Sequence, residues 1–106
     1  MIQLLKKLLG MNETIDLKQI VAGGATILDV RTVEEYKSGH LPGSLNLPLQ
    51  GLNTAGIEKL KIDKSKPIIT CCASGMRSAS AKRILEQQGF EVYNGGGWHS
   101  LKNRLS

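Results

Sequence analysis

The sequence predicts an α/β domain with a mostly parallel central sheet of about five strands and helices on both faces. Short apolar stretches alternate along the chain with segments whose apolar residues recur at helical spacing, and this alternation is typical of parallel strands joined by right-handed crossovers. Aromatic residues make up only 4% of the chain, so Leu, Ile, Val and Ala must supply most of the core. With 106 residues, the chain suits one domain over 1–106.

The first elements are two predicted helices. Apolar residues at helical spacing predict a short amphipathic helix in an N-terminal extension, residues 1–12. We expect it to cover the domain, with docking on a membrane surface or in a dimer as the other option. Asp16 and Gln19 then form an N-cap pair, which predicts a second helix that ends at Gly23 and Gly24.

A buried strand over 26–30 follows, and the capping-box spacing of Thr32 and Glu35 predicts a short helix directly after it. Asp29 and Arg31 lie at this junction. An acid and a base at a strand end could be catalytic, but structural ion pairs are also common in such places. We expect Asp29 to accept N–H bonds from the loop, and Arg31 to pair with a helix carboxylate such as Glu35.

The middle of the chain contains a turn, a strand and a helix. Gly and Pro residues over 39–43 predict the turn, a short strand follows at 45–47, and 52–60 contains the helix. His40 in the turn could act as a general base. A loop histidine more often bonds to the backbone, and the sequence does not bring His40 near a cysteine, so we expect the structural role.

Residues 67–78, PIITCCASGMRS, predict a buried strand, a tight loop and the start of a helix. A thiol at Cys72 would lie among backbone N–H groups at the positive end of that helix, and both features favour the thiolate. Gly75 lets the loop curl, and Arg77 adds a cation that can pair with an oxyanion. We therefore predict that Cys72 is a nucleophile, held by amides that open onto solvent.

The predicted elements after this loop are a helix, a strand, a turn and a closing helix. Their ranges are a helix over 78–88, a strand over 90–93, a flexible turn over 95–97 and a helix over 98–105. We expect Trp98 and Leu101 of the last helix to face the core.

The two cysteines, Cys71 and Cys72, are neighbours. Their Cα atoms are about 3.8 Å apart, below the ~4.4 Å at which ordinary disulfides begin, so they cannot cross-link the fold. Because side chains alternate along a strand, Cys71 must point to the face opposite Cys72. We expect Cys71 to be a packed core residue, with a resolving thiol as the minority alternative.

Four sequence pieces resemble the rhodanese family of sulfurtransferases. Counted from Cys72, the loop has the form CxxGxRS, which is similar to the family's active-site loop. LDVRTVEEY at 28–36, GHLPGSLNLP at 39–48 and GGGWHSL at 95–101 are similar to further family segments in the same order. The likeness spans most of 14–101, and the pieces together are specific where each alone is not.

The resemblance implies a rhodanese-like fold and a double displacement. In this reaction the Cys72 thiolate takes a sulfur atom from a small anionic donor such as thiosulfate, and then passes it to a thiol or to cyanide, a thioredoxin-like protein being one candidate acceptor. We also expect a monomer, with no metal and no cofactor. The resemblance also implies that these loop residues bind the substrate: Arg77, Ala73, Ser74, Gly75, Met76 and Ser78.

The sequence departs from the family pattern at one place in the loop, and two other functions remain open. Family members that use thiosulfate well often carry a basic residue after the cysteine, where this chain has Ala73 and Ser74, so a mercaptopyruvate-type donor or a protein persulfide is also possible. Counted from Cys71, the spacing to Arg77 fits a cysteine-dependent phosphatase or arsenate reductase. A rhodanese-like domain can also be a non-catalytic binding module if Cys72 is unreactive.

Net charge and composition limit the classes of binding partner and the cellular location that we expect. The net charge of +5 attracts anions, but Lys and Arg are scattered and no nucleic-acid motif is present, so we expect small anions rather than nucleic acid. The apolar runs fall far short of the ~18 residues that a membrane span needs. Without an export signal or structural disulfides, and with a thiol that must stay reduced, we expect a cytoplasmic protein.

Overall fold

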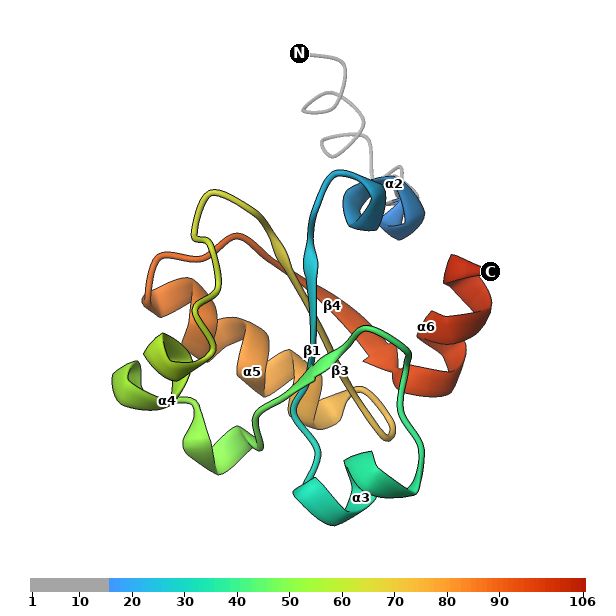
Figure 1. Ribbon diagram of the computed structural model, residues 1–106, viewed down its shortest axis with the longest axis horizontal. Coiled ribbons are helices and arrows are strands. Elements are labelled where there is room, and N and C mark those ends of the chain that lie inside the picture. Colours follow the sequence, from blue (N-terminus) through green and yellow to red (C-terminus); the bar gives the residue numbers. More distant parts are fainter. Residues whose placement is uncertain (1–15) are drawn as a thin grey trace, which may run out of the picture.

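The computed structural model describes residues 16–106 and contains a parallel sheet in the order β2-β1-β3-β4 (Figure 1). The strands are β1 (Thr26–Asp29), β2 (Leu45–Asn46), β3 (Ile68–Cys72) and β4 (Val92–Gly97). The predicted fold class is therefore confirmed, and the described residues contribute 4 strands to the sheet, against the roughly five expected. The predicted extension over 1–12 and its helix lie outside the described residues.

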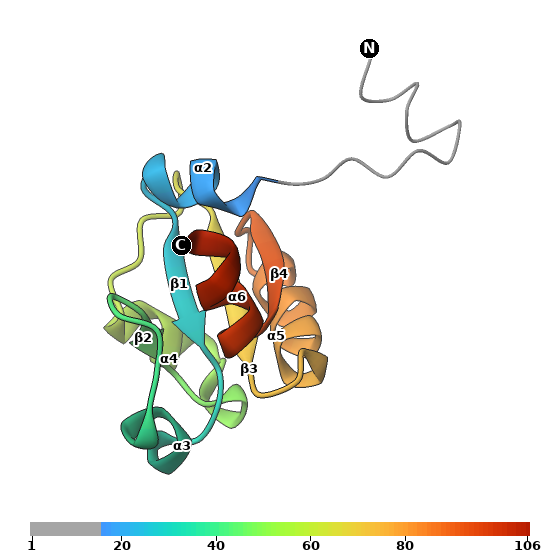
Figure 2. The same cartoon turned by 90° about the vertical axis from the view of Figure 1, so that its right-hand side faces the viewer.

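Helices cover both faces of the sheet (Figures 1 and 2). One face carries α2 (Leu17–Ala22) and α6 (Trp98–Leu105), and the other carries α4 (Thr54–Lys59) and α5 (Met76–Gln87). A short helix α3 (Val33–Ser38) and the 3₁₀ turn η1 (Leu49–Gly51) follow the carboxyl ends of β1 and β2. Within residues 16–106, every helix falls short of the length and apolar character that crossing a membrane requires.

Strand β3 is buried along its whole length and divides the core in two. Ile69 and Cys71 pack with Leu17 and Leu101 on the side of α2 and α6. Ile68 and Cys72 pack on the side of α4 and α5. A strand covered on both faces carries a continuous apolar run, and this explains the composition of 68–72.

The predicted helix caps are present. Asp16 accepts the N–H of Gln19 at the start of α2. At α3, the Thr32 hydroxyl accepts the N–H of Glu35 at 3.2 Å, and the Glu35 carboxylate accepts the N–H of Thr32 at 3.0 Å. Both caps use groups only three residues apart, so sequence spacing predicts them well.

The prediction of a flexible turn over 95–97 is wrong, because these glycines belong to β4. Thr70 pairs with Asn94 while Cys72 pairs with Gly97, so β4 contains a bulge, with Gly96 at a φ of +77°. A Cβ on Gly95 would lie 2.8 Å from the Thr70 carbonyl oxygen, and one on Gly97 would lie 2.9 Å from that of Ala73. The glycines therefore let β4 lie against β3 and the cysteine loop.

Substituting Gly95 tests this close approach. We expect Gly95→Ala to lower the free energy of unfolding by about 2 kcal/mol, because the new methyl group overpacks the contact with Thr70 and Leu101. Gly23→Ala is the matched control, since its Cβ would lie 3.5 Å from its neighbours, and we expect a change within about 0.5 kcal/mol. Urea unfolding measures both, and equal midpoints for the two variants would contradict the packing described for β4.

Candidate active site

Cys72 lies at the carboxyl end of β3, and a three-residue loop, 73–75, joins it to α5. The chain runs from β1 to β2 on one side and then returns past β1 to β3 on the other, so these two successive crossovers run in opposite directions. In open α/β sheets, ligands bind at the carboxyl ends of strands where the chain reverses direction in this way. Cys72 is thus in the position that this topology favours for a site.

Backbone N–H groups surround the sulfur of Cys72. Its Sγ accepts the N–H of Gly75 at 2.9 Å and that of Ser78 at 3.3 Å. Ser78 is in the first turn of α5, where N–H groups have no partner within the helix and carry the positive end of the helix dipole. The predicted helix start at 78 is two residues late, because Gly75, at a φ of +103°, is already the N-cap.

Burial and hydrogen bonding act on the Cys72 thiol in opposite directions. Burial raises its pKa, but hydrogen bonds from the backbone and hydroxyl of Ser78 and from the N–H groups of Gly75 and Ser74 outweigh burial, and the pKa falls below that of an ordinary cysteine. The predicted opening onto solvent is not found. Cys72 is buried, whereas the next two residues of the loop, Ala73 and Ser74, are exposed.

Ser78 and Asn94 connect the loop to β4. The Ser78 hydroxyl lies 2.9 Å from the carbonyl oxygen of Gly75 and 2.5 Å from Oδ1 of Asn94. Asn94 also accepts the N–H of Gly96 at 2.9 Å, which ties it to the bulge. Sequence reasoning missed Asn94, although an Asn before glycines signals a side chain that bonds to backbone two residues on.

Arg77 pairs with Glu35 of α3. Its Nη1 donates to Oε1 at 2.7 Å and its Nη2 to Oε2 at 2.9 Å, and each side chain is 35% exposed. The sequence instead predicts that Arg77 pairs with an oxyanion and that Glu35 pairs with Arg31. Sequence reasoning thus missed Glu35 as a member of the site, although its place in the turn after β1 sets it at the carboxyl edge of the sheet.

Arg31 pairs with Asp29 instead. The predicted partner, Glu35, is therefore wrong, whereas the prediction that Arg31 forms a structural ion pair is confirmed. The guanidinium donates to Asp29 Oδ2 at 2.7 Å and to the carbonyl oxygen of Gly39 at 2.8 Å, and lies 4.9 Å from the centre of the Trp98 ring. Asp29 also accepts the backbone N–H of Arg31, as predicted. Both residues are buried, and the pair fixes the chain between β1 and the turn at Gly39.

Three further residues named in the sequence analysis, Cys71, His40 and Met76, make no hydrogen bond to the Cys72 sulfur. Cys71 faces the opposite side of the sheet, and burial, followed by the charge of Asp29, raises its pKa to about 12. His40 stacks on Tyr36, and its Nδ1 lies 2.7 Å from that residue's carbonyl oxygen, as expected for a structural loop histidine. Met76 is 79% exposed. Over 16–106, no cluster of side chains suited to a metal ion is present.

Comparison with known proteins places most of the chain in one family. The model of the rhodanese-like domain matches residues 12–104. The thiosulfate sulfurtransferase GlpE of Pseudoalteromonas translucida is 36% identical over 77% of this chain and 71% of its own. The structure described as "rhodanese with anions from E. coli" superposes with a TM-score of 0.66 at 32% identity, covering 73% of this chain and 91% of that one.

Other relatives are much longer than this chain. The tRNA sulfurtransferase of Thermoplasma acidophilum is 32% identical over 87% of this chain but only 18% of its own length. The chain spans about a third or less of the first three curated relatives that it matches. The shared part is therefore a domain that also occurs within larger proteins.

Acid unfolding tests the pair of Glu35 with Arg77. Hydrogen bonds from Arg77, then from the Thr32 backbone, lower the pKa of Glu35 to about 2, so its contribution to stability is complete above the unfolded pKa of about 4.3 and is lost as the pH falls towards 2. We expect Glu35→Gln to lower the free energy of unfolding by about 1 kcal/mol at neutral pH, a value reduced for solvent screening, and we expect most of this difference to be lost by pH 2.

The control is Glu34→Gln, which removes a charge from the same turn of α3 but no partner of Arg77. Chemical unfolding measured across this pH range follows both variants. A cost of Glu35→Gln that does not change with pH would contradict the ion pair.

Proposed function

The chain belongs to the rhodanese-like domain family, and on that premise we propose that it is a sulfurtransferase. In this proposal it moves sulfane sulfur from a donor such as thiosulfate to a thiophilic acceptor through a persulfide on Cys72. The observation that carries the proposal is the hydrogen bonding of the Cys72 sulfur to the N–H groups of Gly75 and Ser78. The names of the relatives, thiosulfate sulfurtransferase and tRNA sulfurtransferase, support the same reaction class.

The first step is attack of the Cys72 thiolate on the outer sulfur of the donor. With thiosulfate, a new S–S bond forms to Cys72 while the donor's own S–S bond breaks, and sulfite leaves with the electron pair. The thiolate is the reactive form, so the hydrogen bonds that lower the pKa of Cys72 increase the reactive fraction near neutral pH. The same N–H groups are available to the terminal sulfur of the persulfide.

The second step returns the enzyme to its starting state. The acceptor thiolate or cyanide attacks the terminal sulfur, and Cys72 leaves as a thiolate. A thiol of low pKa is the better leaving group, so the environment that prepares Cys72 as a nucleophile also assists this step. Splitting the transfer into two displacements lets donor and acceptor use the same loop in turn.

The phosphatase alternative required Cys71 as the nucleophile. Cys71 packs among apolar residues on the face opposite the loop, and its pKa of about 12 leaves almost no thiolate at neutral pH. Cys71 and Cys72 therefore differ in pKa, and only for Cys72 does the environment favour the thiolate that a nucleophile needs. A phosphatase mechanism through Cys71 is therefore disfavoured, and a non-catalytic binding module is the function that remains if Cys72 proves unreactive.

Mass spectrometry of the intact protein tests the proposed function. After incubation with thiosulfate or an alkyl persulfide, we expect the mass of one added sulfur, located on Cys72 and removed by a thiol. We expect Cys72→Ser to lose the added sulfur and the turnover, and Cys71→Ser, the matched control, to keep both within about threefold. No added sulfur with either donor, or full activity in Cys72→Ser, would overturn the proposal.

A further inference from the structure

The loop that carries Cys72 contains one charged side chain, Arg77, in the sequence CASGMRS. That guanidinium is held by two hydrogen bonds to Glu35, at 2.7 and 2.9 Å. The other loop side chains, from Ala73 to Met76, are neutral. A donor that approaches the sulfur therefore meets backbone N–H groups and an ion pair, rather than a free cation.

The pair remains ionised at neutral pH. Arg77 and the backbone of Thr32 lower the pKa of Glu35 to about 2, so its carboxylate is charged throughout the physiological range. The guanidinium and carboxylate then sum to zero charge. A dianion such as thiosulfate loses much of the attraction that Arg77 alone would give it, because the Glu35 carboxylate that is hydrogen-bonded to Arg77 repels the same dianion.

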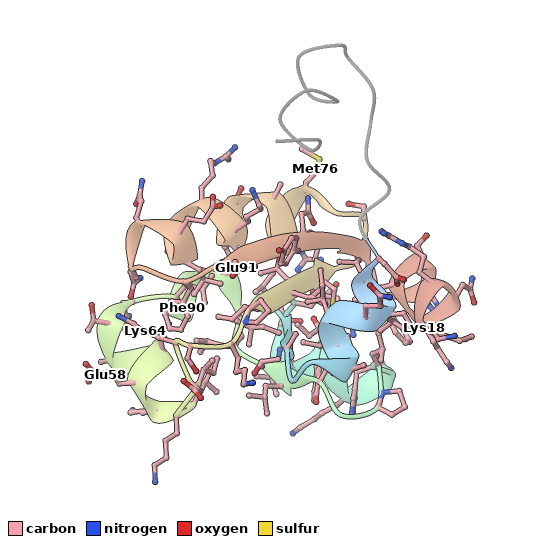
Figure 3. The ribbon with its side chains drawn as sticks, turned by 90° about the horizontal axis from the view of Figure 1, so that it is seen from above. Lys18, Glu58, Lys64, Met76, Phe90 and Glu91 are labelled. Carbon is pink, nitrogen blue, oxygen red and sulfur yellow. The ribbon has the colours of Figure 1, made fainter. Side chains whose placement is uncertain are left out.

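We propose that Glu35 determines donor specificity: by neutralising Arg77, it makes the site favour donors with one negative charge or none, such as alkyl persulfides, over dianionic thiosulfate. This inference rests on the proposed sulfurtransferase function and ranks its donors. Met76, 79% exposed, projects from the start of α5 away from the body of the domain and adds an uncharged, apolar side chain there (Figure 3).

Transfer of sulfur from an alkyl persulfide to Cys72 needs no further reactant. The Cys72 thiolate attacks the outer sulfur of R–S–SH, a new S–S bond forms to Cys72, and the donor's S–S bond breaks. The R–S⁻ thiolate leaves with the electron pair, while the proton stays on the transferred sulfur. The leaving group carries a single new negative charge near Glu35, whereas thiosulfate must release sulfite as a dianion there.

The test compares two donors in two variants. We expect Glu35→Gln to raise kcat/KM for thiosulfate about tenfold, mainly through KM, and to change kcat/KM for 2-hydroxyethyl persulfide less than about twofold. The side-chain amide introduced by Glu35→Gln can still accept the N–H of Thr32, so the cap of α3 is retained. We expect the gain for thiosulfate to shrink as salt rises, which a purely structural effect would not do.

Glu34→Gln is the matched control, because it removes the same charge from the same turn without freeing Arg77, and we expect the donor ratio to stay within about twofold of wild type. If Glu35→Gln fails to fold, Met76→Lys supplies a cation at an exposed position and must shift the ratio in the same direction. Persulfide formation with an unchanged donor ratio overturns this inference alone. No persulfide with either donor overturns the proposed function, and this inference with it.

Discussion

The structure depends on the placement of the first turn of α5 against the end of β3. There the N–H groups of Gly75 and Ser78 converge on the Cys72 sulfur, and together with the Ser78 hydroxyl and the Ser74 N–H they outweigh the effect of burial on the pKa of the thiol. A helix start supplies such unpaired donors only if the chain turns sharply enough to bring it back to the strand end. Gly75, with its φ of +103°, makes this turn.

The rest of the fold fixes this turn from both sides. The bulge of β4 lies against this turn, since a Cβ on Gly75 would be in van der Waals contact with the Cα of Gly96, at 3.4 Å, and Asn94 of the same strand bonds to Ser78. On the side of β1, Glu35 holds Arg77 across the carboxyl edge of the sheet. The loop is thus supported by β4 and α3, neither of which follows it directly in the chain.

Sequence reasoning succeeded where the determining interactions are local and failed where they are distant. The caps at Asp16 and Thr32 join residues three apart, so spacing alone predicted them. Arg77 and Glu35 are 42 residues apart, and a sequence cannot show which of two arginines reaches a carboxylate. The strand through 95–97 was missed because glycine favours turns by local propensity, whereas here β3 and the loop leave no room for a side chain at Gly95 and Gly97. The burial of Cys72 likewise follows from how the layers pack.

The most direct test of the account follows the amide ¹H and ¹⁵N resonances of Gly75 and Ser78 by NMR as the pH is raised. If these groups hold the Cys72 thiolate, both resonances must shift together, with a midpoint below the pKa of an ordinary cysteine thiol, and the shift must vanish in Cys72→Ser. A midpoint at or above that value, or amides that do not respond to ionisation of Cys72, would contradict the central claim.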